Sequence, residues 1–357
     1  MRRLWFSMVK VAIVRRELPI WSNILLRISI AIGGIALAVS SLAFLLRIPV
    51  DLVASRVIDV FIRLDALRYM TVFLPTALGL AIAFHAKLWN LGAEGQIVLG
   101  AIGATYIALF TPVGEVPFLG ATVSLVFASI AGALWALVPA LLRTFLGVNE
   151  ALTTLMMNYI AYYLANYLVY GPWRGRTVYG YPETDPIPTQ CRFPWFPGYS
   201  FSIYPLIISF ALVPLVYMFL YKTRIGIAIR ALGSSGTAVE LSGISRRKVA
   251  IIAFVLSGAL AGFVGGNEVL MYHRKLVPGE KIGAGMGFIS ILVVWFADLN
   301  PLVVPLASYY VSSLHYLRMV IQVGELTEAV ARFFVGLIFV LMLLSIFVAR
   351  YRVVVKR

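Results

Sequence analysis

The residues of this chain that could do chemistry are a few polar side chains within long apolar stretches. The densest group runs from Asn90 to Gln96 and contains Glu94 between two glycines, Gly92 and Gly95. A charge surrounded by lipid costs about 2.5–3.5 kcal/mol even on a lenient scale, so Glu94 needs a function or partners. Glycine permits close backbone approach and can interrupt a helix. The group therefore predicts either a discontinuous helix at a solute path or gate, or a tight contact in which backbone N–H groups cap Glu94.

A second group opens another apolar stretch. Asn149 has the properties of an N-cap, and Glu150 in the first helical turn complements the helix dipole, so both residues have a local explanation. Asn158 lies about two turns further along, where its amide must find a partner among the helices.

Asn267 and Glu268 come late in a third apolar stretch and raise the same question. Glu268 is expected to snorkel toward water or to pair with Arg274. The candidates for a substrate path or gate are Asn90, Glu94, Gln96, Glu150, Asn158 and Asn267.

A polar segment of small residues, about 222–248, separates two apolar stretches. Glycine and alanine recur from Gly226 onward, and Gly233-Ser234-Ser235-Gly236 interrupts the pattern. An ordinary charged loop is one interpretation, but small residues on short helices suit packing into a groove of another protein. The positions of interest are Arg230, Ala231, Gly233, Glu240 and Gly243.

The sequence gives little support for a metal site, a nucleotide-binding site or an enzyme active site. Cys191 is the single cysteine, and His85, His273 and His315 are far apart without metal-ligand spacing. The chain lacks the G-x-x-x-x-G-K-[ST] phosphate loop, so it is not expected to bind ATP through that device. We also find no nucleophile and base pairing, and we expect no cofactor or metal on this chain.

The composition predicts that these segments are embedded in lipid. Of the 357 residues, 61% are hydrophobic and only 13% are charged, whereas a soluble domain carries about 25% charged residues. The mean hydropathy is +0.93. The net charge of +15 lies largely in short segments between apolar stretches, which indicates membrane topology rather than nucleic-acid binding.

About ten apolar stretches are long enough to span a bilayer as helices. They lie near 24–46, 67–86, 89–110, 117–142, 148–170, 201–221, 249–271, 282–299, 301–321 and 329–349. The stretch around 51–64 alternates charged and aliphatic residues and is predicted to be an amphipathic helix at the interface. We interpret the first stretch as a retained span rather than a signal peptide.

An even number of spans puts three basic segments on one side of the membrane. These are the N-terminal residues 1–23, the segment 222–248 and the C-terminal residues 351–357, which flank or interrupt a membrane domain of 24–350. The positive-inside rule makes that side cytoplasmic, with both termini there.

The opposite side carries one long loop, about 171–200, rich in proline, glycine and aromatic residues. Repeated proline prevents a regular helix, and Trp and Tyr favour the membrane interface. The loop is an interfacial connector or a docking surface for a solute-delivering partner. Five plus five spans would give the two halves opposite orientations, as in an inverted repeat.

Taken together, these segments resemble a known family. Residues 88–96, LWNLGAEGQ, resemble the FNIGxEGQ signature of ribose- and nucleoside-type permeases of ABC importers. Residues 147–160, GVNEALTTLMMNYI, look like the GVNEVISTIMLNYIA segment of the nucleoside-permease branch. Residues 230–262 are similar to that family's coupling region, except that Ser234-Ser235-Gly236 replaces its usual Asn-Pro.

The resemblance implies an all-α, type II-importer-like bundle in a prokaryotic cytoplasmic membrane. It implies two cytoplasmic ATPase subunits, which bind ATP and Mg²⁺, a second related permease and an extracytoplasmic solute-binding protein. ATP-driven closure of the ATPases would push the segment 226–247. The expected substrate is a nucleoside or a related simple sugar. Alternatives are ribose-like sugars, a flavin or branched-chain amino acids, and, in a different class, an ion-coupled transporter using Glu94 or Glu268.

Overall fold

The computed structural model describes residues 10–15, 49–177, 180–322 and 351–356, with single residues between 29 and 47 and between 333 and 347. The chain divides into two units, residues 61–316 and residues 1–60 with 317–357.

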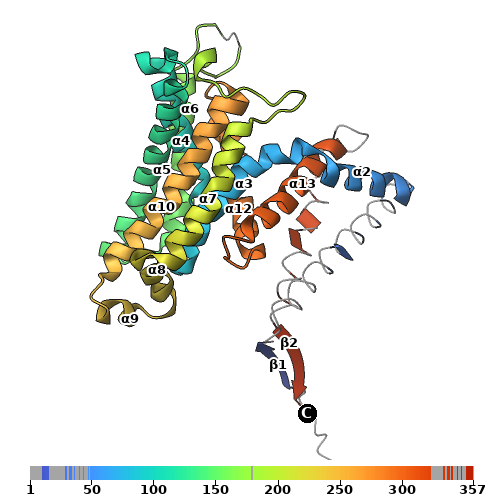
Figure 1. Ribbon diagram of the computed structural model, residues 1–357, viewed down its shortest axis with the longest axis vertical. Coiled ribbons are helices and arrows are strands. Elements are labelled where there is room, and N and C mark those ends of the chain that lie inside the picture. Colours follow the sequence, from blue (N-terminus) through green and yellow to red (C-terminus); the bar gives the residue numbers. More distant parts are fainter. Residues whose placement is uncertain are drawn as a thin grey trace, which may run out of the picture. The chain divides into compact units, whose positions relative to one another are not determined.

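The larger unit is a bundle of helices in which α10 is central and packs against α3, α4 and α5 (Figure 1). Its long helices are α3 (Leu67–His85), α4 (Ala93–Phe110), α5 (Leu119–Leu146), α6 (Glu150–Tyr170), α7 (Ile203–Lys222), α10 (Arg246–Asn267) and α13 (Val304–Gln322, which extends into the smaller unit). The short ones are η1 (Leu64–Ala66), η2 (Pro112–Glu115), η3 (Thr189–Cys191), α8 (Arg224–Ser234), α9 (Gly236–Leu241), the π-helical η4 (Glu268–His273), α11 (Gly279–Gly283) and α12 (Met286–Phe296).

Six helical segments of the described residues are long and apolar enough to cross a membrane, and each coincides with an expected span. They are Leu64–His85, Ala93–Phe110, Leu119–Leu146, Ile203–Lys222, Arg246–His273 and Gly279–Phe296. The chain is thus a multi-pass membrane protein, because polar backbone can cross lipid only when a helix satisfies it internally.

The other four expected spans are not confirmed. The stretches 148–170 and 301–321 form helices, α6 with 21 residues and α13 with 19, but neither is among the six. The stretches 24–46 and 329–349 lie largely outside the described residues. The total of ten spans and the inverted halves therefore stay predictions.

The expected span 282–299 is broken rather than continuous. Ala284 and Gly285 adopt positive φ values of 48° and 80° between α11 and α12. Left-handed backbone ends one helix and lets the next begin in a new direction. As a result, the first N–H groups of α12 are free to bond outside their own helix.

The contact of α5 with α10 depends on glycine. A Cβ atom on Gly132 would collide with the backbone of Gly258 and Gly262 on α10. Without side chains at these points the two helices approach closely enough for van der Waals packing, which drives helix association in lipid.

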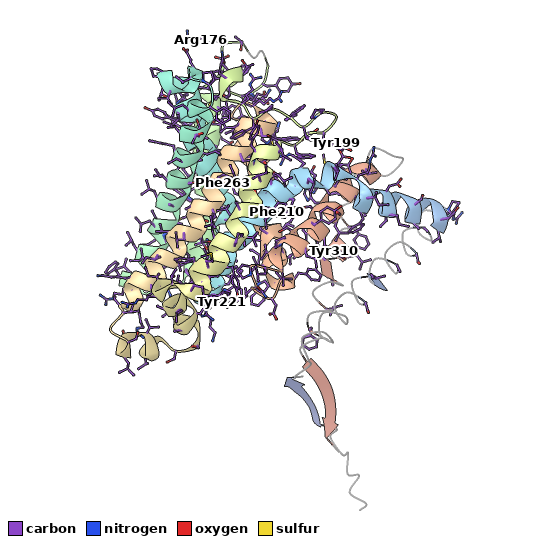
Figure 2. The ribbon with its side chains drawn as sticks, in the orientation of Figure 1. Arg176, Tyr199, Phe210, Tyr221, Phe263 and Tyr310 are labelled. Atoms are coloured by element: carbon purple, nitrogen blue, oxygen red, sulfur yellow. The ribbon has the colours of Figure 1, made fainter. Side chains whose placement is uncertain are left out.

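The long loop and the small-residue segment lie at opposite ends of this bundle, as the topology predicts. Figure 2 shows Arg176, in the loop, at one end and Tyr221, next to α8, at the other. The assignment of these ends to the two sides of the membrane is not tested by the structure.

The smaller unit contains a short antiparallel ladder, which the sequence did not predict. Strands β1 (Lys10–Arg15) and β2 (Tyr351–Lys356) pair with Lys10 opposite Lys356. Valine and isoleucine favour such pairing. Helix α2 (Val50–Ile62) forms where the amphipathic helix 51–64 was expected; its position at a membrane interface stays a prediction.

Candidate functional site

The connection between α3 and α4 is held by a pair of buried amides, Asn90 and Gln96. Asn90 Nδ2 donates to Gln96 Oε1 at 3.1 Å, and Gln96 Nε2 donates back to Asn90 Oδ1 at 3.0 Å. Asn90 also donates to Ser257 Oγ on α10 at 2.9 Å and accepts from Gly92 N at 3.0 Å. The pair thus connects the interrupted backbone to α10 with every amide atom bonded.

Helix α6 supplies the remaining partners of this connection. Asn158 Oδ1 accepts from Gly95 N at 2.8 Å, and Asn158 Nδ2 donates to Leu91 O at 2.9 Å. Thr154 Oγ1 accepts from Leu91 N at 3.1 Å. The expectation that Asn158 finds a partner among the helices is confirmed. Its side chain bonds an N–H group and a carbonyl group of the backbone that have no partner within a helix.

Glu94 caps a helix that lies far away in the sequence. Its carboxyl oxygens accept from Gly285 N at 2.8 Å, Gly287 N at 2.7 Å and Tyr162 Oη at 3.0 Å. The side chain is completely buried. The N-terminus of α12 favours a carboxyl group there because its first N–H groups lack partners inside the helix. We call the connected residues Asn90, Glu94, Gln96, Thr154, Asn158, Tyr162 and Ser257 the polar knot.

The N-terminus of α6 is built as the sequence predicts. Asn149 Oδ1 accepts from Ala151 N at 3.0 Å and from Leu152 N at 3.2 Å, which is an N-cap. Glu150 forms an ion pair with Arg143 Nε at 3.1 Å across the turn from α5. This geometry accounts for Glu150 locally.

The expected partner of Glu268 was wrong. Glu268 pairs with Arg68, 200 residues away on α3, through Nη1–Oε1 at 2.8 Å and Nη2–Oε2 at 2.6 Å. The two side chains are 0% and 5% exposed, and the ring of Tyr272 covers the guanidinium at 4.0 Å. Arg274 instead lies over the ring of Trp195 at 3.9 Å. Arg68 was missed by sequence reasoning, although it was visible as an isolated cation at the start of an apolar stretch.

Asn267 differs from the other candidates. Its side chain is completely buried, and neither of its amide atoms has a hydrogen-bond partner among the described residues. It directly precedes the π-helical turn Glu268–His273, and such turns are frequent at functional sites. A buried amide without partners is destabilising by a few kcal/mol. Asn267 is therefore the candidate most suited to receive a polar group in another state.

At the other end of the bundle, α8 and α9 form the predicted short helices. Arg230 turns inward, where Nε donates to Leu220 O at 3.0 Å and the guanidinium covers Tyr221 at 4.3 Å. Gly233 lies so close to His85 O on α3 that a Cβ would collide with it. Arg230 and Gly233 thus attach α8 to α7 and α3.

The outer surface of this end is more apolar than expected. Ile227 is 48% exposed and Leu241 is 86% exposed. Glu240 pairs with Arg246 Nε at 2.6 Å, Gly243 has a φ of 78° at the turn after α9, and Ala231 is half-buried. Sequence reasoning missed Ile227 and Leu241; the available signal was the presence of large aliphatic residues in a segment otherwise made of small and polar residues.

Comparison with known families decides the class. The family model described as the permease component of the branched-chain amino acid transport system matches residues 62–343. The chain belongs to this permease family. The matched range contains the whole polar knot as well as α8 and α9, so the resemblance to ABC importer permeases is confirmed.

The names of several known relatives of this permease mention sugars or nucleosides. A glucose ABC transporter permease protein of Haloferax volcanii is 27% identical over 95% of this chain and 92% of the relative. A guanosine ABC transporter permease protein of Bacillus subtilis is 28% identical over 64% and 66%, and a nucleoside ABC transporter permease protein of Lactococcus lactis is 28% identical over 67% of both chains. No solved structure matches significantly.

The family places this permease in the membrane part of an ABC importer, as a transport subunit. Among the described residues, no cluster of histidine, cysteine or acidic side chains could hold a metal ion.

Proposed function

We propose that this permease lines the path of an ABC importer for a nucleoside or a related simple sugar in the cytoplasmic membrane. The observation that carries the substrate class is the group of sugar and nucleoside permeases among its relatives. Ribose-like sugars, flavins and branched-chain amino acids are the alternative substrates, since specificity is expected to rest largely on the binding protein.

The proposed assembly contains a second related permease, two cytoplasmic ATPase subunits and an extracytoplasmic solute-binding protein. ATP and Mg²⁺ bind to the ATPases and no cofactor binds to this chain. The chain crosses the membrane about ten times, with α6 and α13 among the spans and both termini cytoplasmic. The termini lie on one side in any even count of spans, which agrees with the pairing of β1 with β2.

Helices α8 and α9 form the surface that receives the ATPase in this proposal. Ile227 and Leu241 supply exposed apolar side chains, as a helix that docks into a groove requires. Arg230, Ala231 and Gly233 transmit the movement because Arg230 and Gly233 fix α8 to α7 and α3. Glu240 and Gly243 hold the turn after α9 in place.

The six candidates for the path divide by role. Asn267 is proposed to contact solute, since its amide atoms are free of partners among the described residues. Asn90, Glu94, Gln96 and Asn158 are proposed to brace the wall beside the path, and Glu150 to fix the start of α6.

Uptake into vesicles tests the proposal. The permease is reconstituted with the other subunits of its importer, and labelled nucleosides and simple sugars are offered with ATP on the cytoplasmic side or withheld. Saturable uptake that needs both ATP and the binding protein is expected. Uptake that follows a proton or sodium gradient without ATP would instead support an ion-coupled transporter.

Two pairs of variants locate the functional surfaces. Asn267→Ala is expected to raise the KM of ATP-driven uptake, whereas the matched Asn149→Ala loses only an N-cap, worth about 1 kcal/mol of stability, and keeps the KM. Leu241→Asp is expected to release the ATPase on purification, whereas Ser234→Asp, which adds the same charge to the same segment, keeps it. An unchanged KM for Asn267→Ala would remove Asn267 from the path.

A further inference from the structure

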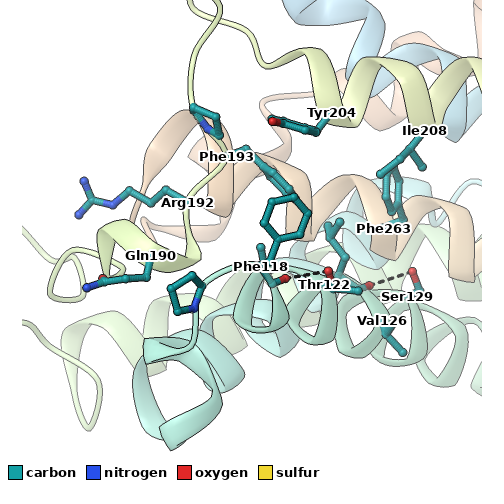
Figure 3. A pocket seen from close by; sticks show the side chains of 14 residues that line it. Phe118, Thr122, Val126, Ser129, Gln190, Arg192, Phe193, Tyr204, Ile208 and Phe263 are labelled. Atoms are coloured by element: carbon teal, nitrogen blue, oxygen red, sulfur yellow. Dashed lines mark hydrogen bonds between the residues drawn. The ribbon is translucent and has the colours of Figure 1, made fainter.

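A groove of about 460 Å³ lies between α5 and α7, and the loop after η3 closes one of its ends (Figure 3). Its aromatic wall is made by Phe118, Phe193, Tyr204 and Phe263. Phe118 is 77% exposed and Val126 is 54% exposed, so the groove opens sideways from the bundle. In a membrane protein this flank of α5 borders lipid or another subunit.

The groove offers almost nothing to a polar solute. The hydroxyls of its α5 wall are already used, because Thr122 Oγ1 donates to Phe118 O at 2.8 Å and Ser129 Oγ donates to Leu125 O at 3.0 Å. Figure 3 shows both bonds running along the helix rather than across the groove. A sugar or nucleoside requires several hydrogen-bond partners when buried, whereas an alkyl chain requires none. The wall therefore favours an apolar occupant.

The length of the groove matches one leaflet of a bilayer. Its α5 wall runs from Phe118 to Ser129, about three turns or roughly 16 Å of helix. Half of the hydrocarbon core is about 15 Å. The groove also begins at the N-terminal end of α5, next to Arg192 and Phe193 of the loop, so it would cover the depth of a single acyl chain.

Two cations without acidic partners lie at or near the loop end: Arg192 lines the groove, and Arg274 lies outside the lining, over Trp195 of the same loop. Among the described residues, no carboxyl group forms an ion pair with Arg192 or Arg274. Of the two acidic residues nearest to Arg274 in the sequence, Glu268 is taken by Arg68 and Glu280 accepts from Asn166. Burial and the charge of Arg274 both lower the pKa of Arg192, so the two guanidinium groups repel each other and an anion between them would relieve that repulsion.

The loop holds both cations at this end. Arg192 Nε donates to Ile187 O at 2.5 Å, and Trp195 Nε1 donates to Met271 O at 2.8 Å beneath Arg274. Figure 3 shows the Arg192 side chain running outward, away from the aromatic wall. The positive charge is thus placed where a headgroup would lie while its chain occupies the groove.

From this combination we infer that the groove binds one acyl chain of an anionic phospholipid, with the negatively charged headgroup held at Arg192 and Arg274. A charged headgroup and an apolar chain of one-leaflet length correspond to the two parts of the site. The inference concerns the flank of the bundle and does not depend on which solute the importer carries.

Native mass spectrometry of the purified importer tests this directly. The complex is exposed to equal amounts of phosphatidylglycerol and phosphatidylcholine of the same chain length, and the retained lipid is measured. Preferential retention of phosphatidylglycerol is expected. The double variant Arg192→Gln/Arg274→Gln is expected to lose that preference by about fivefold for each cation removed. The matched control Arg174→Gln removes an exposed loop cation that neither lines the groove nor lies over Trp195, and it is expected to keep the preference.

A second variant tests the chain-binding part. Ile208→Trp, which fills the groove from α7, is expected to lose retained lipid of both kinds while the complex stays assembled. Equal retention in the wild type and in both variants would overturn the inference. Displacement of the lipid by inorganic phosphate alone would show a simple anion site, and loss of the second permease from Ile208→Trp would show that a protein covers the groove; either result also overturns the inference.

Discussion

The polar knot and the far end of α10 bury similar side chains but satisfy them differently. In the polar knot every amide and carboxyl oxygen of Asn90, Glu94 and Asn158 has a partner at 2.7–3.1 Å. At the end of α10, the Arg68–Glu268 ion pair is well formed, yet the adjacent Asn267 has no partner among the described residues.

This difference indicates that the polar knot has a structural role, whereas the region of Asn267 can bind another group. A fully satisfied buried network rigidifies the elements it connects, whereas a partly satisfied one is unstable until something else binds or moves. The polar knot connects α4, α6, α10 and α12 as a fixed frame. The region of Asn267 lies where α10 changes from α to π geometry, and it is the region we expect to change during transport.

The largest effect is expected from breaking the buried ion pair. Arg68→Met leaves the buried Glu268 with only the ring of His273, at 3.9 Å, beside it and should lower the free energy of unfolding by about 3–5 kcal/mol. The double variant Arg68→Met/Glu268→Leu should recover most of that loss, because an apolar pair leaves no charge buried. Thermal unfolding of the purified complex measures both. Wild-type stability in Arg68→Met would show that the ion pair does not hold α3 to η4 at the end of α10.

A loss of comparable size is expected inside the polar knot. Asn158→Ala leaves the Gly95 N–H and the Leu91 carbonyl without partners, at about 1–3 kcal/mol for each unsatisfied buried group. The same unfolding measurement applies, with Asn149→Ala as the matched loss of an asparagine. If Asn158→Ala costs less than Asn149→Ala, the polar knot is not a rigid frame.

Glu94→Gln should cost somewhat less, about 1–3 kcal/mol in total. The amide group keeps one acceptor oxygen but directs an N–H₂ donor toward the donor N–H of Gly285 or Gly287. We expect stability and transport to fall together, since the same bonds fix α12. Transport that disappears at unchanged stability would mean that Glu94 acts on solute directly, as a gate residue would.

The smallest effect on stability is expected at Asn267. Asn267→Ala removes an amide that has no partner in the described structure, so the free energy of unfolding should change by less than about 1 kcal/mol or rise. Asn267→Ala and Asn158→Ala are the same substitution, so their difference in stability compares the end of α10 with the polar knot directly. A large loss of stability would show that Asn267 is bonded in the assembled importer, and would end the contrast between the regions.

Much of the fold could be predicted from the sequence because its signals are local. Six spans were located within a few residues of their observed bounds, since a run of apolar residues long enough to cross lipid needs no tertiary information. The cap at Asn149 also depends on residues within one turn. The break at Ala284–Gly285 was missed because a two-residue change in backbone direction leaves an apolar run intact.

The candidate site was predictable in its residue types but not in its partners. Glu94 and Asn158 were recognisable as buried polar groups that require bonds, but the partner of Glu94 lies 191 residues away at Gly285. For Glu268 the nearby Arg274 was the natural expectation, and the structure uses Arg68 instead. Sequence distance is a poor guide once helices pack side by side.

The sequence alone thus determined that this protein is a membrane protein. It also determined the positions of most of its spans and the permease family to which it belongs, because hydropathy and motif spacing are properties of contiguous residues. Only the tertiary structure decided which polar groups are satisfied, that Asn267 is left without a partner among the described residues, and that Arg192 lies at the mouth of an apolar groove with Arg274 close to it. Those features depend on which helix faces meet, and that depends on the packing of the whole bundle.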